Sequence, residues 1–252
     1  MCGIAGEIRF DMRTADASVV SRMADTLAPR GPDASGAWHQ GRVALAHRRL
    51  KIIDLSERAQ QPMVAPDLGL TLVFNGCIYN YRELRVELEQ AGARFFSDGD
   101  TEVVLRAYRH WGTSFVTRLH GMFALAIHER DSGRVVMARD RFGIKPLYLS
   151  QSADGHRLRF ASTLPALLAG GDVDTRIDPV ALEHYLMWHA VVPPPRTLLQ
   201  GVRKLPPATL TVWEADGRRT DTCYWNPPFN TDPALAALPD EARQQQVLAA
   251  LE

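Results

Sequence analysis

The sequence predicts an α+β fold with sheets in the middle and helices outside. Two observations support this prediction. Short apolar runs bounded by glycine, asparagine and aspartate recur as two sets of buried strands, one early in the chain and one between residues 121 and 161. Segments with apolar residues at helical spacing are interleaved with these strands. Layers of sheet covered by helices are the simplest way to bury both kinds of apolar face.

The first quarter of the chain opens with a short apolar strand over residues 3–10. A helix follows over 18–27, where Val19, Met23 and Leu27 recur at helical spacing and Pro29 ends the pattern. Residues 30–33 contain glycine and proline and predict a turn. Two strand-like runs, 43–46 and 50–53, are separated by basic residues.

The next segments read as one strand and two helices. Residues 70–74 form an apolar strand that is expected to stop at Asn75-Gly76, a strong turn signal. A helix over 81–90 is amphipathic, with Gly92 after its end. A second helix is expected over 101–111, and Asp100 is a plausible N-cap for it.

The middle of the chain predicts two hairpins. Strands 121–127 and 134–138 flank a turn at 131–133, and strands 147–149 and 158–161 flank Asp154-Gly155. A short helix is expected over 164–168. The sequence therefore alternates strand pairs with helices up to this point.

The character of the chain changes after residue 174, because ten of the sixteen prolines lie from Pro179 onward. We expect a helix over 179–188, an extended proline-rich strap, a hairpin over 209–224, a linker, and a helix over 241–251. The predicted domains are residues 1–215, which include the strap, and residues 216–252, which form a linker and the start of a truncated second domain.

Composition excludes several functional classes. The formal net charge is +0, with 46% hydrophobic and 23% charged residues, which gives no electrostatic reason to expect nucleic acid or an anionic membrane as a partner. No apolar run is long enough to span a bilayer, and the first residues lack the basic leader of a signal peptide. Three widely spaced cysteines, which fit no zinc pattern, favour a reduced, cytoplasmic compartment.

Cys2 is the first candidate for chemistry. A lone cysteine is usually a small buried hydrophobe. Position 2 changes that expectation, because removal of Met1 would place a thiol and a free α-amino group on one residue. Such an amine has a reference pKa of roughly 7.7–8.0, so it can accept the thiol proton without a separate histidine.

Six segments in order and spacing resemble the class II glutamine amidotransferases, and most closely the glutaminase half of glutamine-hydrolysing asparagine synthetase. The resemblance covers about residues 1–215. It implies a four-layer αββα sandwich of the N-terminal nucleophile hydrolase type, with two mainly antiparallel sheets. The segments are Met1 to Gly6, Arg30 to Asp33, Ala46 to Leu50, Phe74 to Gly76, Gly99 to Glu102 and Ala138 to Leu147.

The same segments hold groups that suit free glutamine, and the resemblance implies the same roles for them. Arg49 can bind the α-carboxylate in a bidentate manner. Asp100 can pair with the α-ammonium, which is compatible with a helix-capping role. The Asn75 side-chain amide and the Gly76 backbone N–H can form an oxyanion hole. The alternatives are a solvated charge at Arg49 and a plain hairpin turn at Asn75-Gly76.

Other conspicuous residues are expected to be structural. His47 is interpreted as a packing histidine. The segment from Arg139 to Leu147 is expected to brace the site, through a charge cluster that includes Asp140, or to face a second domain. The sequence departs from the family at Cys77, because asparagine synthetases typically carry a glutamate there that helps hold the substrate ammonium. Asp100 would then act alone, and we expect Cys77 to be a packed small residue.

The chain has no Ser-Gly-Gly-x-Asp-Ser loop and no P-loop. We therefore expect an isolated glutaminase domain that holds no cofactor and no metal. ATP and Mg²⁺ are expected in a synthetase domain that would follow in the full-length chain and would be its main partner, together with L-glutamine. The acceptor would be aspartate or N-acetylglutaminylglutamine. Segments 75–79, 164–168 and 189–193 are similar to the subgroup that amidates the latter dipeptide.

Two other functions are consistent with the sequence. One is a catalytically silent module that binds glutamine or braces a synthetase domain. The other is an N-terminal nucleophile hydrolase that acts on a different amide. The glutaminase is favoured because its proposed site residues are all present, namely Cys2, Arg49, Asn75, Gly76 and Asp100. The sequence leaves open whether the protein forms a homodimer.

Overall fold

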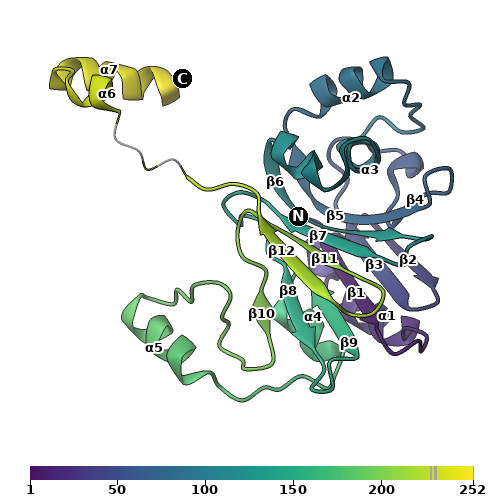
Figure 1. Ribbon diagram of the computed structural model, residues 1–252. Helices are drawn as coiled ribbons and strands as arrows, with labels where there is room; N and C mark the ends of the chain where they lie inside the picture. Colours follow the sequence, from purple (N-terminus) through teal and green to yellow (C-terminus); the bar gives the residue numbers. More distant parts are fainter. Residues whose placement is uncertain (228, 230–231, 252) are drawn as a thin grey trace.

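Two six-stranded antiparallel sheets stacked face to face form the centre of the molecule (Figure 1). The computed structural model describes residues 1–227, 229 and 232–251. The first sheet has the order β10-β8-β9-β1-β3-β2, and the second has the order β12-β11-β7-β6-β5-β4. The strands are β1 (Gly3–Arg9), β2 (Ala34–Gln40), β3 (Val43–Arg49), β4 (Met63–Ala65), β5 (Leu70–Ile78), β6 (Gly121–Glu129), β7 (Val135–Arg139), β8 (Tyr148–Gln151), β9 (Arg157–Ala161), β10 (Arg203–Lys204), β11 (Thr209–Trp213) and β12 (Arg219–Cys223).

Helices cover the outer face of each sheet. Helices α1 (Ala17–Asp25) and α4 (Leu164–Ala169) pack on the first sheet, and α2 (Tyr81–Gln90) and α3 (Asp100–Trp111) pack on the second. Three 3₁₀ segments lie in the connections, at η1 (Ala28–Arg30), η2 (Glu57–Ala59) and η3 (Gly112–Arg118). The predicted α+β sandwich with four layers, αββα, is therefore confirmed.

Strand periodicity distributes the apolar side chains among three layers. Ile4 and Ile8 of β1 face the core between the sheets, whereas Ala5 packs toward α1 and α4. In β5, Val73 faces the same inner core, while Leu72 and Phe74 pack under α2 and α3. Successive side chains of a strand point to opposite faces, so both sheets are buried on both sides and read as continuous apolar runs.

Local capping sets the helix ends. The Asp16 carboxylate accepts hydrogen bonds from the Ser18 and Val19 N–H groups at the start of α1. Asp178 does the same for Val180 and Ala181 at the start of α5 (Pro179–Met187), with Pro179 as the first helical residue. The helices predicted at 18–27 and 179–188 therefore form close to the expected bounds.

The structure corrects three local predictions. Residues 50–53 are not a strand but begin a loop, and β3 instead runs through the basic residues to Arg49. Strand β5 does not stop at Asn75-Gly76, since it continues to Ile78 and pairs with β6 throughout. Asp100 is the first residue of α3 rather than its N-cap, which is Gly99. Strands β2, β4 and β10 were not expected; β4 and β10 are too short to show a periodicity.

The C-terminal part has two different regions. Strands β11 and β12 form the predicted hairpin, and β12 is the edge strand of the second sheet. The boundary predicted between residues 215 and 216 falls inside this hairpin, so the sheet extends past it to Cys223. Helices α6 (Pro233–Ala236) and α7 (Asp240–Leu251) lie apart from the sheets, and apolar residues of α7 such as Val247 and Leu251 are exposed (Figure 1).

The helices within the described ranges include none that is long and apolar enough to cross a bilayer.

A buried ion pair ties β1 to β9 on the helical side of the first sheet. Arg159 Nε lies 2.7 Å from Glu7 Oε2, and both side chains are almost fully buried. Glu7 also accepts a hydrogen bond from the Asp16 N–H, and Arg159 donates to the carbonyls of Gly170 and Gly171. One pair of side chains thus connects two strands, the start of α1 and the end of α4.

We expect Glu7→Ala to lower the free energy of unfolding by about 3–5 kcal/mol, because it leaves a buried guanidinium without its counter-charge. Urea unfolding followed by circular dichroism measures this change. Glu87→Ala is the matched control, since the Glu87–Arg118 pair is exposed and is expected to contribute about 0–1 kcal/mol. Equal losses in the two variants would show that the Glu7–Arg159 pair is not a stabilising link.

Candidate active site

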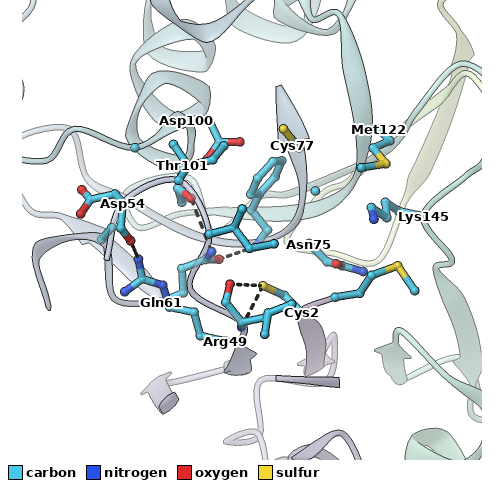
Figure 2. A pocket seen from close by; sticks show the side chains of 18 residues that line it. Cys2, Arg49, Asp54, Gln61, Asn75, Cys77, Asp100, Thr101, Met122 and Lys145 are labelled. Carbon is cyan, nitrogen blue, oxygen red and sulfur yellow. Dashed lines mark hydrogen bonds between the residues drawn. The ribbon is translucent and has the colours of Figure 1, made fainter. Parts of the chain in front are cut away.

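The predicted site residues converge on one cavity of about 230 Å³. Cys2, Arg49, Asn75, Gly76 and Asp100 all line it, although they come from both sheets and from α3. Figure 2 shows these side chains around the cavity, with Arg49 and Cys2 on one side and Asp100 and Cys77 on another. The tertiary fold therefore brings together every residue that the sequence proposed for substrate chemistry.

Cys2 lies just before β1, at the end of the first sheet. Its Sγ accepts a hydrogen bond from the Leu50 N–H at 3.4 Å and contacts the Leu50 carbonyl at 3.7 Å. Arg30 Nε donates to the Cys2 carbonyl at 3.1 Å, which fixes the backbone of the residue. Burial raises the pKa of the Cys2 thiol, while the Leu50 N–H, the chain amino group and Arg49 act in the opposite direction. The thiol therefore needs a base before it can attack.

Gly76 presents its backbone N–H to the cavity because of the way β5 ends. Strand β4 pairs only with residues 70–72 of β5, so the following N–H groups on that edge have no strand partner. The Phe74 N–H donates to Gln61 Oε1 at 2.6 Å, and the Ile78 N–H donates to Asp100 Oδ2 at 3.0 Å. By the two-residue repeat, the Gly76 N–H points to the same edge between them.

Glycine is required at this position by close packing. A Cβ on residue 76 would lie 2.4 Å from the Met122 carbonyl oxygen and 2.8 Å from Phe123 Cβ. The strand pairing places Phe123 directly opposite. Any larger residue would push β5 away from β6 and displace the adjacent Asn75.

The Asn75 side chain is a preorganised donor. Asn75 shares the inner face of β5 with Val73, so its amide points between the sheets toward Cys2. The residue is 1% exposed, and among the described residues its Nδ2 has no hydrogen-bond partner. A buried donor left unpaired costs free energy, so it is expected to serve a ligand.

Arg49 is held by the loop that follows β3. Its two terminal nitrogens donate to the carbonyls of Ser56 and Asp54. Each terminal nitrogen of a guanidinium carries two hydrogens, so one on each is left over for a carboxylate. Residues 50–62, predicted in part as a strand, therefore work as a loop that orients the arginine and closes one side of the cavity.

Asp100 supplies the negative charge. It is 5% exposed, and burial raises the pKa of its carboxyl to about 6, against the opposing effect of the Ile78 N–H and of Arg49. One carboxylate oxygen accepts the Ile78 N–H. The cavity thus carries a cation at Arg49 and an anion at Asp100, the complement of a zwitterionic amino acid.

Cys77 lies in β5 next to Gly76 and lines the cavity. It is half-buried, and burial and Asp100 raise the pKa of its thiol. Cys2, Cys77 and Cys223 are all free thiols. Cys77 is therefore a neutral wall residue beside Asp100, as a small packed side chain would be.

The predicted structural residues behave as expected. His47 is fully buried, and its Nε2 donates to the Phe74 carbonyl at 3.1 Å, which joins β3 of the first sheet to β5 of the second. Burial lowers the pKa of His47 to about 3, so it is neutral. Asp140 accepts four backbone N–H groups, and Arg139 donates to three carbonyls, so the 139–147 segment is a rigid brace, in which Arg141 is half-buried.

Two residues at the site carry no role in the sequence interpretation. Gln61 holds the Phe74 N–H at the edge of β5 and lines the cavity. Lys145 lines the cavity from the loop between β7 and β8 and is 5% exposed. The sequence motif that contains Lys145 indicated that this segment lies near the site. It did not indicate that the Lys145 side chain lines the cavity, because that depends on how the loop is folded. In the described part of the chain no cluster of three His, Cys, Asp or Glu residues could hold a metal ion.

Comparisons with known proteins agree with this geometry. Residues 1–225 match the family model of the glutamine amidotransferase domain. The chain is 41% identical over 250 residues to a putative asparagine synthetase [glutamine-hydrolyzing] of Mycobacterium tuberculosis, covering 94% of this chain and 38% of the relative. It is 34% identical over 229 residues to asparagine synthetase [glutamine-hydrolyzing] 3 of Bacillus subtilis, covering 90% of this chain and 37% of the relative.

The fold also matches a solved structure. Glutamine phosphoribosylpyrophosphate amidotransferase from B. subtilis, complexed with ADP and GMP, superimposes with a TM-score of 0.67 at 18% identity. The match covers 92% of this chain and 50% of the other. At this identity the likeness concerns the fold alone.

The fold and the family match define an enzyme domain of the glutamine amidotransferase class, with the N-terminal nucleophile type of sandwich. The chain belongs to the class II glutamine amidotransferase domain family, and the two relatives above are named as glutamine-hydrolysing asparagine synthetases, the first of them as putative. It spans less than two fifths of the length of those two relatives.

Proposed function

We propose that this chain hydrolyses L-glutamine to glutamate and ammonia through a thioester on Cys2. The observation that carries the proposal is the buried Asn75 amide, which has no partner among the described residues and lines the same cavity as the Cys2 thiol. An unpaired donor beside a nucleophile suits an oxyanion that forms only during reaction. The family match supports glutamine as the source of the ammonia that the domain releases.

The reaction begins after Met1 is removed and the amino group belongs to Cys2. This amine takes the thiol proton, and the thiolate attacks the side-chain amide carbon of glutamine. The oxygen then carries negative charge and accepts hydrogen bonds from Asn75 Nδ2 and the Gly76 N–H. When the C–N bond breaks, the protonated amine returns its proton to the leaving nitrogen, and ammonia departs. Water, deprotonated by the same amine, then attacks the thioester, and glutamate and the thiol are released.

Recognition of glutamine rests on charge. The Arg49 guanidinium binds the α-carboxylate through the two remaining N–H groups of its terminal nitrogens, and the Asp100 carboxylate binds the α-ammonium. The two charges are held by different elements, β3 with its loop and α3, so their separation is fixed by the fold. This arrangement favours a free amino acid over a peptide or an N-acylated amine.

The ammonia would be used by a partner domain. We propose a C-terminal synthetase domain of the same full-length protein as that partner, because the curated relatives are much longer than this chain. ATP and Mg²⁺ would act there, and the acceptor would be aspartate or N-acetylglutaminylglutamine. A reduced, cytoplasmic compartment suits the three free thiols.

We expect untagged protein to have lost Met1 and to release glutamate from glutamine, and Cys2→Ser to lose most of this activity, because a hydroxyl proton is far harder to remove than a thiol proton. Intact mass and coupled glutamate detection measure both properties. Cys77→Ser is the matched control and is expected to stay active. Glutamine binding by the untagged parent without turnover would favour the silent module, and turnover of α-blocked glutamine at an equal rate would favour another amide hydrolase.

We expect Asn75→Ala to lower kcat by about 10²–10³-fold with little change in KM, because the lost donor acts on the oxyanion and not on the bound substrate. Steady-state kinetics test this, with circular dichroism to confirm folding. Cys77→Ala, which truncates a side chain two positions further along the same strand, controls for changes in β5. A KM effect without a kcat effect would assign Asn75 to substrate binding.

Glutamine binding should weaken as the pH falls through about 6, because protonated Asp100 loses its charge and cannot pair with the ammonium. The dissociation constant should rise about tenfold for each pH unit below that value and stay level above it. Calorimetric titration of Cys2→Ser with glutamine between about pH 5 and pH 8 measures this. Asp100→Asn should bind weakly and show no such pH dependence. If the variant with Asp100→Asn shows the same pH dependence of glutamine binding as Cys2→Ser alone, Asp100 does not bind the substrate ammonium.

A further inference from the structure

Lys145 is a buried cation in the cavity with no role in the reaction described so far. It is 5% exposed, and it lines the same wall region as Asn75 and Met122. Figure 2 shows Lys145 on the opposite side of Cys2 from Arg49 in that view. Lys145 is therefore not part of the charge pair proposed to bind the α-carboxylate and α-ammonium.

The backbone of Lys145 is fixed from both sides. Its N–H donates to Asp140 Oδ2 at 2.9 Å, and its carbonyl accepts from Arg139 Nε at 2.8 Å. Asp140 Oδ2 also accepts the Phe123 N–H at 3.1 Å, and Phe123 is the β6 residue opposite Gly76. The loop that carries Lys145 is thus tied directly to the strand beside the proposed oxyanion hole.

Among the described residues, Lys145 forms a hydrogen bond through its backbone N–H, whereas its ammonium has no hydrogen bond or ion pair. Asp140 is the nearest carboxylate in the sequence. Its two oxygens already accept hydrogen bonds from four backbone N–H groups, and neither is paired with the Lys145 ammonium. Burial and the neighbouring Arg30 lower the pKa of Lys145, while Cys2, Asp140 and Cys77 favour its charged form. The residue as a whole is 5% exposed, but its Nζ keeps some accessible surface, so the unpaired ammonium is available to a charged partner in the cavity.

The other charged groups around Cys2 are engaged elsewhere or are compensated when substrate binds. The Cys2 thiolate is favoured by the chain amino group and by Arg49, and opposed by Asp100 and by burial. Arg30 donates to the Cys2 carbonyl and so is engaged with the backbone. Once Arg49 and Asp100 bind a zwitterionic substrate, their charges are compensated. Lys145 is then a cation that lines the same cavity as the Cys2 thiol and is not engaged by the substrate's α-groups.

We propose that Lys145 is a positioning residue for the nucleophile: its ammonium stabilises the Cys2 thiolate and so raises the fraction of enzyme ready to attack. The catalytic role of Lys145 rests on the glutaminase activity proposed above. The brace formed by Arg139 and Asp140 serves to hold this ammonium at the cavity wall. A lysine is suited to this role, because it is a compact charge with three donors that does not need a fixed fork geometry.

The test is the pH dependence of Cys2 alkylation by iodoacetamide, which needs no glutamine turnover. All proteins carry Cys77→Ala and Cys223→Ala, so that Cys2 is the remaining thiol. Lys145→Met and Lys145→Gln should shift the apparent pKa of Cys2 upward by about one unit, which slows alkylation near pH 7 about tenfold. Lys145→Arg should keep most of the reactivity.

Lys204→Met is the matched control, because Lys204 is a half-buried lysine that donates to the Val192 carbonyl and does not line the cavity. It should leave the profile unchanged. Superimposable profiles for the parent, Lys145→Met and Lys145→Gln would overturn the proposal, as would an equal shift in Lys204→Met. If one of the two Lys145 variants does not fold, the other decides.

Glutamate release measured on the same proteins separates the two proposals. A parent that alkylates normally but releases no glutamate contradicts the glutaminase and leaves the Lys145 result to stand on its own. A parent that is active, with alkylation profiles that do not respond to Lys145, contradicts only the role of Lys145. In the expected case kcat/KM falls about tenfold in Lys145→Met.

Discussion

The face-to-face packing of the two sheets is the constraint on which the site depends. Cys2 belongs to the end of the first sheet, and Asn75 and Gly76 belong to the second, so the nucleophile and the proposed oxyanion donors meet only if the sheets are held at a fixed separation and register. The apolar layer between the sheets supplies the free energy that holds them together. The buried hydrogen bond from His47 to the Phe74 carbonyl fixes the position of β3 relative to β5, one residue from Asn75.

Around this interface, three polar side chains of the site are held by backbone groups and not by one another. Arg49 is held by the carbonyls of Asp54 and Ser56, Asp100 by the Ile78 N–H, and Cys2 by Leu50. Such contacts leave the charges and donors available to a ligand while fixing their directions. Preorganisation of this kind lowers the cost of binding and of charge development.

Much of the fold and the site could be predicted from local patterns. Alternating and continuous apolar runs indicated most strands, helical spacing at Leu84 and Leu88 indicated α2, and the order of the motifs indicated the family. The errors fell where tertiary contacts override a local signal. Asn75-Gly76 looks like a hairpin turn, but pairing with β6 and the close approach of Met122 keep it in an extended strand. Residues 50–53 look like a strand, but the loop they begin is held by its bonds to Arg49.

By itself, the sequence determined the residue types that the chemistry needs: a thiol at position 2, a guanidinium at Arg49, an amide at Asn75, a carboxylate at Asp100. It also determined the periodicities that bury both faces of each sheet. Only the tertiary structure decided that these groups share one cavity, that the Asn75 amide is left without a partner among the described residues, and that Lys145 lines the same cavity as Cys2. The physical reason is that direction and burial come from contacts between segments far apart in the chain, which no local pattern encodes.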